Sequence, residues 1–406
     1  MGMNGTPVSE RKHIAFFGCR NAGKSSLLNA VTGQKKAIVS DIPGTTTDPV
    51  YKSMELLPAG PVVMIDTPGL DDEGGLGAER IAKALEVLRK TDVAVVVTDG
   101  AKGLREEDLT ILSAVRERGI PYAFVCNKEE KCDRKAFEES LQSAGISDAE
   151  ILYTGAYSGV GIRELKERIA SLAKDASEEE ERSILGGLVR AGDTVLLVVP
   201  IDKAAPKGRL ILPVQQVLRD LLDHGATALI VRDSELSEAL STFGQSIRLV
   251  ITDSQAMKTV SSLVPEEIPL TTFSILFARY KGDLEEELRG FRAIEALEDG
   301  DTVLIAEGCT HHRQCGDIGT EKIPKGLLAF TKKNIRTEFT SGGEFPEDLT
   351  KYKVVIHCGG CMLNEREMKH RIEEAKTQGV PITNYGMVLS GFSGSLKRTT
   401  EFLEKA

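Results

Sequence analysis

The stretch GCRNAGKSSLLNAVTG, residues 18–33, follows the apolar run HIAFF, residues 13–17. Its first eight residues match Gly-x-x-x-x-Gly-Lys-Ser/Thr, between a strand pattern and a helical pattern. Glycines let backbone amides turn toward phosphate oxygens, and the positive end of the following helix points at them. Lys24 would reach the β- and γ-phosphates, and the Ser25 hydroxyl would bind Mg²⁺. The stretch predicts a phosphate-binding loop rather than a glycine-rich turn that only opens a helix. The loop residues expected to contact nucleotide are Gly18, Asn21, Ala22, Gly23, Lys24, Ser25 and Ser26.

A second apolar run, residues 61–65, ends in Asp66-Thr67-Pro68-Gly69. After a phosphate-binding loop, this pattern predicts that Asp66 holds Mg²⁺ through water and that the Gly69 amide senses the γ-phosphate. No glutamine follows at a position that would orient the attacking water. Glu73 could take that role, although acidic residues on a loop more often only interact with solvent. We therefore expect slow intrinsic hydrolysis of the nucleotide.

The polar loop VSDIPGTTTDPVY, residues 39–51, lies between these two segments. It offers hydroxyls at Thr45, Thr46 and Thr47, next to proline and glycine. One of them should bind Mg²⁺ when a triphosphate is present; Thr46 is the prediction, with its neighbours Thr45 and Thr47 as close alternatives. Taken alone, the loop is equally compatible with a solvated turn. The flanking motifs favour the role in Mg²⁺ binding.

Two further segments concern the base of the nucleotide. Residues 122–126 (YAFVC) lead into Asn127-Lys128-Glu129-Glu130, and a later run ends in YTGAYSGVGIREL, residues 153–165. This ordered set resembles the small GTPases, specifically the TrmE-Era-like branch of tRNA-modification and ribosome-assembly GTPases. The resemblance implies guanine recognition, with Glu130 in place of the usual aspartate and therefore a weaker preference for guanine. The guanine contacts that it implies are Asn127, Lys128, Glu130, Gly155 and Ala156.

The composition is that of a soluble globular protein. The chain has 406 residues, of which 41% are hydrophobic and 28% charged, so two or three domains are expected. No apolar run is long enough to span a membrane, and the first residues lack the apolar core of a signal peptide. These features predict a cytoplasmic protein without a membrane partner. The net charge of −10 argues against a nucleic-acid partner.

The second half of the chain repeats itself. GDTVLLVVP (residues 192–200) recurs as GDTVLIAEG (residues 300–308), and IRLVITDSQAM (residues 247–257) aligns with YKVVIHCGGCM (residues 352–362). Each copy alternates short apolar runs with amphipathic stretches, which predicts parallel strands covered by helices. We therefore expect an α/β fold in which a phosphate-loop nucleotide domain precedes two related, duplicated α/β units with parallel sheets.

Only the second copy carries cysteines where its strands end. His357-Cys358-Gly359-Gly360-Cys361 follows one strand pattern and Cys309 follows another, whereas the first copy has neither cysteine nor histidine at the aligned positions. The fold itself therefore does not require these thiols. Three thiolates at one sheet edge suit an iron–sulfur cluster, a structural zinc completed by His311, His312 or His357, or a redox disulfide between the two neighbouring cysteines.

The combination of motifs resembles one family over the whole chain. A TrmE-Era-like GTPase domain followed by two α/β units, the last with Cys309-x-His311 and His357-Cys358-x-x-Cys361, is similar to the FeFe-hydrogenase H-cluster maturation GTPases, the HydF family. The resemblance implies three domains. These are a GTPase domain at residues 1–175, an α/β dimerization domain at 184–285 and an α/β cluster-binding domain at 290–406.

The same resemblance implies a function. It makes Cys309, Cys358 and Cys361 the ligands of a 4Fe-4S cluster. His311 or His357 would be a fourth ligand or a group beside the ligands, and Asn21 would bind K⁺ next to GTP and Mg²⁺. The implied protein is a dimeric scaffold that carries a diiron H-cluster precursor to apo FeFe-hydrogenase, with two radical-SAM maturases as earlier partners. The alternative from another class is a tRNA-modification or ribosome-assembly GTPase with a structural Cys/His zinc site.

Overall fold

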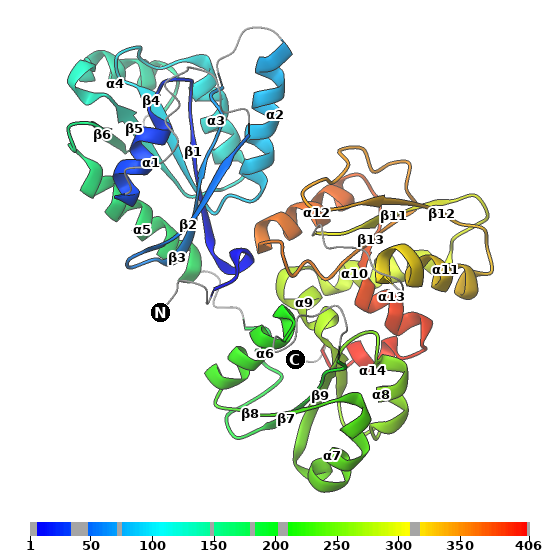
Figure 1. Ribbon diagram of the computed structural model, residues 1–406. Helices are drawn as coiled ribbons and strands as arrows, with labels where there is room; N and C mark the ends of the chain where they lie inside the picture. The colour runs from blue at the N-terminus through cyan, green and yellow to red at the C-terminus, as the bar shows by residue number, and fades with distance from the viewer. Residues whose placement is uncertain are drawn as a thin grey trace. The chain divides into compact units, whose positions relative to one another are not determined.

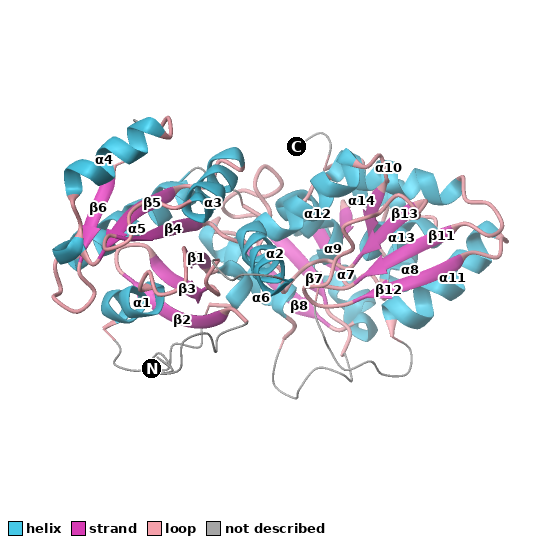
Figure 2. Cartoon of the chain, turned by 90° about the horizontal axis from the view of Figure 1, so that it is seen from above, coloured by secondary structure: helices cyan, strands magenta, loops and turns pink. Residues whose placement is uncertain are grey.

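The chain folds into two compact units, Met1–Glu181 and Arg182–Ala406. The computed structural model describes the backbone of residues 6–33, 48–70, 75–146, 150–178, 183–201, 210–308 and 317–403, and the side chains of these residues except 75–80 and 176–178. Each unit consists of strands flanked by helices (Figures 1 and 2). Among the described residues, no helix combines the length and the apolarity that crossing a membrane requires.

The first unit contains a six-stranded sheet in the order β2-β3-β1-β4-β5-β6, in which only β2 is antiparallel to its neighbour. Its strands are β1 (Lys12–Phe17), β2 (Val50–Leu56), β3 (Gly60–Asp66), β4 (Val93–Asp99), β5 (Tyr122–Asn127) and β6 (Ile151–Thr154). Its helices are η1 (Val8–Glu10), α1 (Lys24–Thr32), α2 (Gly75–Arg89), α3 (Glu106–Glu117), η2 (Glu129–Lys131), α4 (Arg134–Ser143) and α5 (Ile162–Glu178).

Both faces of this sheet are apolar, because β1 and β4 are buried almost along their whole length. Ile14 and Phe16 of β1 belong to the core under α1 and α5, whereas Ala15 and Phe17 belong to the core under α2, α3 and α4. Phe16 pairs with Asp66 in the parallel register of β1 and β3. The carboxyl ends of these strands therefore meet at one edge, where α/β sheets bind ligands.

The second unit contains two four-stranded parallel sheets, β10-β9-β7-β8 and β14-β13-β11-β12. The strands are β7 (Thr194–Val198), β8 (Thr227–Val231), β9 (Ile247–Thr252), β10 (Leu270–Thr272), β11 (Thr302–Ala306), β12 (Arg336–Thr340), β13 (Val354–His357) and β14 (Ile382–Asn384). The helices are α6 (Leu212–Asp223), η3 (Asp233–Glu235), α7 (Leu236–Phe243), η4 (Gly244–Ser246), α8 (Met257–Leu263), α9 (Phe273–Lys281), α10 (Leu284–Glu295), the π-helical turn η5 (Ile318–Lys322), α11 (Ile323–Thr331), α12 (Glu365–Thr377), α13 (Tyr385–Phe392) and α14 (Leu396–Thr400).

The strand order is the same in both sheets once β7 is matched with β11 and β9 with β13. The last strand of each sheet also ends in an equivalent helix cap. Thr272 accepts a hydrogen bond from the Ile275 amide at the start of α9, and Asn384 accepts one from the Met387 amide at the start of α13. The predicted fold class, with two related α/β units, is confirmed. The two sheets lie in one compact unit, and the domain boundaries proposed from the sequence stay a prediction.

A buried carboxyl ties α10 to the cap of α13 in this unit. Glu287 is 2% exposed and accepts a hydrogen bond from Asn384 Nδ2. Burial, followed by the nearby charge of Asp283, raises the pKa of Glu287 to about 8. Because the unfolded chain would ionise near the ordinary pKa of about 4.3, the folded state binds the extra proton between the two values. This contribution to stability is present at low pH and is lost as the pH rises through about 8.

We predict that unfolding near neutral pH releases about one proton from Glu287. Chemical denaturation at about pH 5, 7 and 9 should therefore show a larger fall in unfolding free energy for the wild type than for Glu287→Gln, which keeps the acceptor for Asn384 but cannot ionise. Parallel pH profiles of the two proteins would contradict the prediction.

Candidate nucleotide and metal sites

The phosphate-binding loop holds its lysine ready for an anion. Lys24 is 7% exposed, and its Nζ donates hydrogen bonds to the backbone oxygens of Gly18 at 2.8 Å and Cys19 at 2.9 Å. Gly18 has φ +144°, and a Cβ there would lie 2.0 Å from the Val97 carbonyl oxygen. A side chain at this position would push the loop off β4. The structure thus places Lys24 inside the backbone of the predicted phosphate-binding loop.

The predicted Mg²⁺ residues Ser25 and Asp66 also meet. The Ser25 hydroxyl donates a hydrogen bond to Asp66 Oδ2. The other carboxylate oxygen, Oδ1, is buried and has no hydrogen-bond partner within the described part of the chain. Burial raises the pKa of Asp66, while the hydrogen bond from Ser25 and the charge of Lys24 lower it. A buried oxygen of this kind fits a hydrated cation, so the residues present suit Mg²⁺.

Gly69 explains how the segment after β3 approaches the phosphate-binding loop. A Cβ at Gly69 would lie 2.7 Å from the Arg20 Cα, so only glycine fits there without displacing the loop. This close approach suits the predicted contact of its amide with a γ-phosphate. The predicted residues Thr45, Thr46 and Glu73 lie outside the described residues.

Asn127, predicted to contact guanine, joins two loops in the structure, and its contact with guanine stays a prediction. Its Nδ2 donates to the Ala22 backbone oxygen at 2.7 Å. Its Oδ1 accepts from the Ala156 amide at 3.3 Å and from the Thr154 hydroxyl at 3.4 Å. The side chain therefore fixes the phosphate-binding loop against the loop that carries Gly155 and Ala156. These bonds within the protein indicate a role in holding the two loops together.

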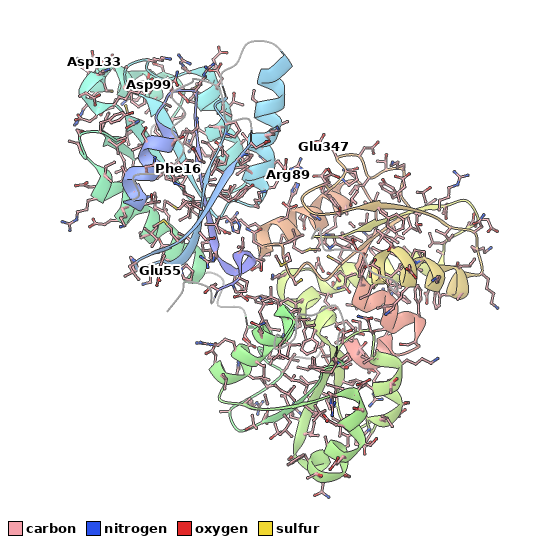
Figure 3. All side chains as sticks on the ribbon, viewed as in Figure 1. Phe16, Glu55, Arg89, Asp99, Asp133 and Glu347 are labelled. Carbon is pink, nitrogen blue, oxygen red and sulfur yellow. The ribbon has the colours of Figure 1, made fainter. Side chains whose placement is uncertain are left out.

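Lys128 lies beside Asn127 with φ +60° and has two partners. Its Nζ donates to the Asn21 backbone oxygen and to Asp99 Oδ2, both at 2.7 Å. Asp99, at the end of β4 (Figure 3), is a site residue that the sequence reasoning missed. A signal was available in the sequence, because Asp99 directly follows the strand pattern VAVVVT, residues 93–98. Glu130 is exposed on η2, and its role in recognising guanine stays a prediction.

The second unit places Cys358 directly after β13, which is a neighbour of β11. Strands β11 and β13 pair in parallel, with Ala306 opposite His357. Beyond this pair, the Gly308 amide donates a hydrogen bond to Cys358 Sγ at 3.0 Å. Burial raises the pKa of the Cys358 thiol, while the amides of Gly308 and Gly360 lower it by hydrogen bonding. Amide donors to sulfur are typical of iron–sulfur ligands, so this half of the site fits a cluster.

The remaining members of the predicted set are only partly visible. Cys361 lies three residues after Cys358, in the turn that follows β13, whereas Cys309, His311 and His312 lie outside the described residues. Within the residues that are described, no three His, Cys, Asp or Glu side chains gather as a metal site would require. The meeting of all three thiols therefore stays a prediction, supported by the pairing of the two strands.

His357 uses both of its ring nitrogens inside the protein. Arg371 Nη1 lies 3.0 Å from Nε2, and Nδ1 lies 2.7 Å from the Cys358 backbone oxygen. Because arginine can only donate, Nε2 must accept and Nδ1 must carry the proton. Burial, with the charge of Arg371, lowers the pKa of His357 to about 3, so the ring is neutral. This arrangement leaves no lone pair for a metal and supports the predicted role beside the ligands.

Sequence reasoning also missed Arg371, whose side chain is fully buried on α12. Besides His357, it donates to Glu367 Oε1 at 2.8 Å and to the Gly342 backbone oxygen at 3.1 Å. Its guanidinium lies over the Phe345 ring at 5.0 Å. Arg371 therefore fixes the imidazole that precedes Cys358.

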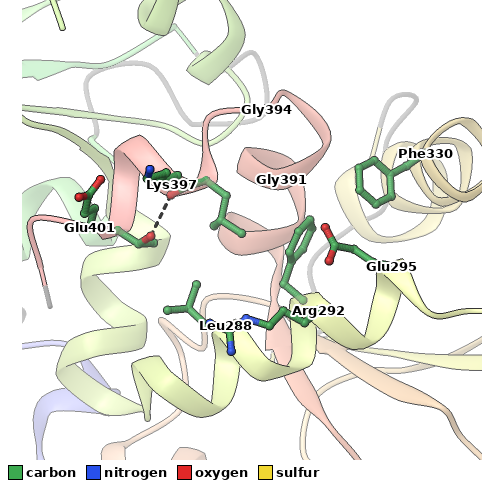
Figure 4. A pocket seen from close by; sticks show the side chains of 11 residues that line it. Leu288, Arg292, Glu295, Phe330, Gly391, Gly394, Lys397 and Glu401 are labelled. Atoms are coloured by element: carbon green, nitrogen blue, oxygen red, sulfur yellow. Dashed lines mark hydrogen bonds between the residues drawn. The ribbon is translucent and has the colours of Figure 1, made fainter.

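A cavity of about 620 Å³ lies among α10, α11, α13 and α14, away from these groups (Figure 4). None of the predicted site residues lines it. Its lining residues are Leu288, Phe291, Arg292, Glu295, Phe330, Gly391, Gly394, Leu396, Lys397, Thr400 and Glu401.

Three family models match the chain in sequence order. Residues 13–128 match the model described as a 50S ribosome-binding GTPase. Residues 184–282 match the Hydrogen maturase F dimerization domain, and residues 285–402 match the Hydrogen maturase F tetramerization domain. The two maturase models adjoin, and each contains one of the four-stranded sheets.

Individual proteins of known identity resemble only part of the chain. GTPase Der of Kosmotoga olearia is 30% identical over 186 residues, which are 43% of this chain and 42% of that protein. The tRNA modification GTPase MnmE of Heliobacterium modesticaldum is 36% identical over 168 residues, which are 41% of this chain and 35% of that protein. The chain thus spans less than half the length of these relatives.

Solved structures give similarly partial matches. A variant of Aquifex aeolicus Era bound to GDP and AlF4⁻ has a TM-score of 0.35 and 19% identity, over 58% of this chain and 99% of that chain. The cytosolic domain of the T. maritima FeoB iron transporter has a TM-score of 0.31 and 23% identity, over 41% of this chain and 65% of that chain.

Proposed function

The chain belongs to the hydrogen maturase F family and carries a TrmE-Era-like GTPase domain, and from this premise we propose that it is a GTP-hydrolysing scaffold for H-cluster assembly. It would hold a 4Fe-4S cluster and a diiron H-cluster precursor, and would deliver that precursor to apo FeFe-hydrogenase. The main support is the hydrogen bond that the Gly308 amide donates to Cys358 Sγ, with a nitrogen–sulfur distance of 3.0 Å. This bond joins the end of β11 to the cysteine pair after β13.

The first unit supplies the nucleotide chemistry. Lys24 would neutralise phosphate charge, Ser25 would bind Mg²⁺ directly, and Asp66 would hold it through water. The link from Asp99 through Lys128 to the phosphate-binding loop keeps that loop in place before nucleotide arrives. The nucleotide is GTP, with guanine recognised by the segment that contains Glu130.

The second unit supplies the metal chemistry. Cys309, Cys358 and Cys361 would hold the 4Fe-4S cluster, which with three protein thiolates supplies one iron able to take an exchangeable ligand. His357 positions the backbone at Cys358, and the Gly308 and Gly360 amides hydrogen-bond the Cys358 sulfur. The diiron precursor is the cargo. Two radical-SAM maturases would act earlier, and the matched dimerization and tetramerization models support self-association.

We predict that anaerobic reconstitution with iron and sulfide yields a brown protein whose reduced form gives the EPR signal of a 4Fe-4S cluster. Cys358→Ser should lower bound iron to about a quarter or less, because the sulfur ligand is lost together with the hydrogen bonds that it accepts from two amides. Cys132→Ser, a thiol of the first unit, is the matched control and should bind iron like the wild type. A colourless protein that binds one zinc per chain would instead favour the translation-type GTPase with a structural zinc site.

We also predict that GTP turnover is faster in K⁺ than in Na⁺ by about tenfold or more, because K⁺ would take the place of an arginine finger. Asn21 is exposed with φ +62°, a conformation that glycine also adopts without strain. Asn21→Gly therefore removes the side chain while it preserves the loop, and should abolish the K⁺ advantage without lowering the rate in Na⁺. Equal wild-type rates in the two salts would contradict the assignment.

A further inference from the structure

Two thiols lie close together at the two ends of residues 127–131, the segment proposed to contact guanine. Cys126 is the penultimate residue of β5, and Cys132 follows η2. Their sulfur atoms lie 3.4 Å apart, and neither takes part in a disulfide. We propose that Cys126 and Cys132 form a reversible disulfide that weakens nucleotide binding, so that GTP binding depends on the thiol redox state. The regulatory part of this inference rests on the proposed nucleotide site.

The local packing leaves room for the bond. A disulfide requires a sulfur–sulfur distance of about 2.05 Å, so the two atoms must approach by little more than about 1 Å. Gly100 borders the pair. A Cβ at Gly100 would lie 2.9 Å from Cys132 Cβ and 3.1 Å from Cys126 Sγ. Glycine therefore keeps open the space in which the thiols meet, and any larger residue would separate them or displace the loop.

The two cysteines differ in access, which sets the order of the reaction. Cys126 is fully buried, whereas Cys132 is half-buried. The Cys132 thiolate would attack a small disulfide such as oxidised glutathione, forming a mixed disulfide and releasing one thiol. The Cys126 thiolate would then attack the Cys132 sulfur and release the second thiol. Two protein thiols are oxidised, one small disulfide is reduced, and the two protons end on the two released thiols.

Burial of Cys126 makes the second step the slow one. Burial, with the hydrogen bond to Cys132, raises the pKa of the Cys126 thiol. The thiolate is the attacking species, so closure of the disulfide should accelerate as the pH rises.

The disulfide would close a covalent loop that contains residues proposed to bind the nucleotide. The segment between the thiols contains Asn127, which holds the phosphate-binding loop, and Lys128, which holds Asn21. Its position is set by the Gly100 amide, which donates to the Asn127 backbone oxygen at 2.7 Å. Drawing Cys132 toward Cys126 would pull on η2, which is tied to Lys128 because the Lys131 amide donates to the Lys128 backbone oxygen at 2.9 Å. We expect the hydrogen bonds of Asn127 and Lys128 to lengthen and the affinity for nucleotide to fall.

The bond itself can be tested by peptide mapping of the full chain after incubation with oxidised glutathione. Trypsin cuts after Lys128 and Lys131, so the disulfide would join peptide 119–128 to peptide 132–134. We expect this linked pair in the oxidised protein and its loss after dithiothreitol. Its absence, with both thiols still open to alkylation after denaturation, would overturn the proposal. This readout does not depend on nucleotide binding.

The regulatory effect is tested by fluorescent GDP binding to the same samples. Oxidation should weaken binding by about tenfold, the loss expected from about one good hydrogen bond, and reduction should restore it. Cys132→Ser should bind like the reduced wild type and should not respond to the oxidant. A linked peptide without a change in affinity, or an equal loss in Cys132→Ser, would overturn the regulatory role. If reduced protein bound no guanine nucleotide at all, the proposed nucleotide site would fail instead.

Discussion

Replacement of Lys24 by alanine is expected to slow GTP hydrolysis by about 100- to 1000-fold. This is the typical loss of rate when an enzyme loses one preorganised hydrogen-bond donor that stabilises the charge of the transition state. Lys24 Nζ lies 2.8 Å and 2.9 Å from the Gly18 and Cys19 backbone oxygens, inside the loop that would surround the phosphates. Alanine removes the charge and leaves both carbonyls without this donor. The rate of phosphate release at saturating GTP, compared with wild type, measures the effect.

The same variant also separates the two sites. Lys24 and the cysteines lie in different compact units, so iron content and the EPR signal should remain those of the wild type. Lys166→Ala, which removes an exposed lysine of α5, is the control for the lost charge and should hydrolyse GTP normally. A Lys24→Ala protein that loses iron as well as hydrolysis would show that the two units do not fold independently.

The sequence predicted those parts of the structure that local patterns and repetition encode. The spacing of the phosphate-binding loop placed Lys24 and Ser25 at the start of a helix, and the apolar run before Asp66 placed that carboxylate at the end of a strand. The alternation of apolar runs with amphipathic stretches predicted parallel strands, whose carboxyl ends share one sheet edge, and β11 and β13 do pair in parallel.

What the sequence did not predict depends on contacts between side chains distant in the chain. A motif assigns Asn127 to guanine, but the fold engages its amide with Ala22 and Ala156. A histidine next to a cysteine suggests a ligand, and only the position of Arg371 shows that its ring is already engaged. Arginine on an amphipathic helix is normally assigned to the solvent face, because it is seldom fully buried unless paired. Its position is the one available signal, because Arg371 stands three residues after Met368 and four before Ala375, on the buried face of α12.

Arg371 should therefore be among the most sensitive positions of the second unit. We expect Arg371→Met to lower the free energy of unfolding by about 3–5 kcal/mol, the usual cost of removing one partner from a buried ion pair. The substitution preserves much of the volume but leaves the Glu367 carboxylate, the Gly342 carbonyl and His357 Nε2 without their donor. Chemical denaturation of the cluster-free protein measures this loss without any contribution from bound iron.

Two comparisons identify the origin of the loss. Lys376→Met on the same helix breaks only exposed ion pairs, with Asp283 and Glu373, and should cost less than about 1 kcal/mol. Arg371→Lys should not rescue stability, because three separate guanidinium nitrogens serve the three acceptors and a single ammonium nitrogen cannot reach all of them. Adding Glu367→Gln to Arg371→Met should recover part of the loss, since the unpaired charge is then removed.

If Arg371→Met were no less stable than Lys376→Met, the contacts of Arg371 would not hold the end of β13. The positioning of Cys358 would then depend on its other contacts, the Gly308 and Gly360 amides on its sulfur and its own amide on the Ala306 backbone oxygen.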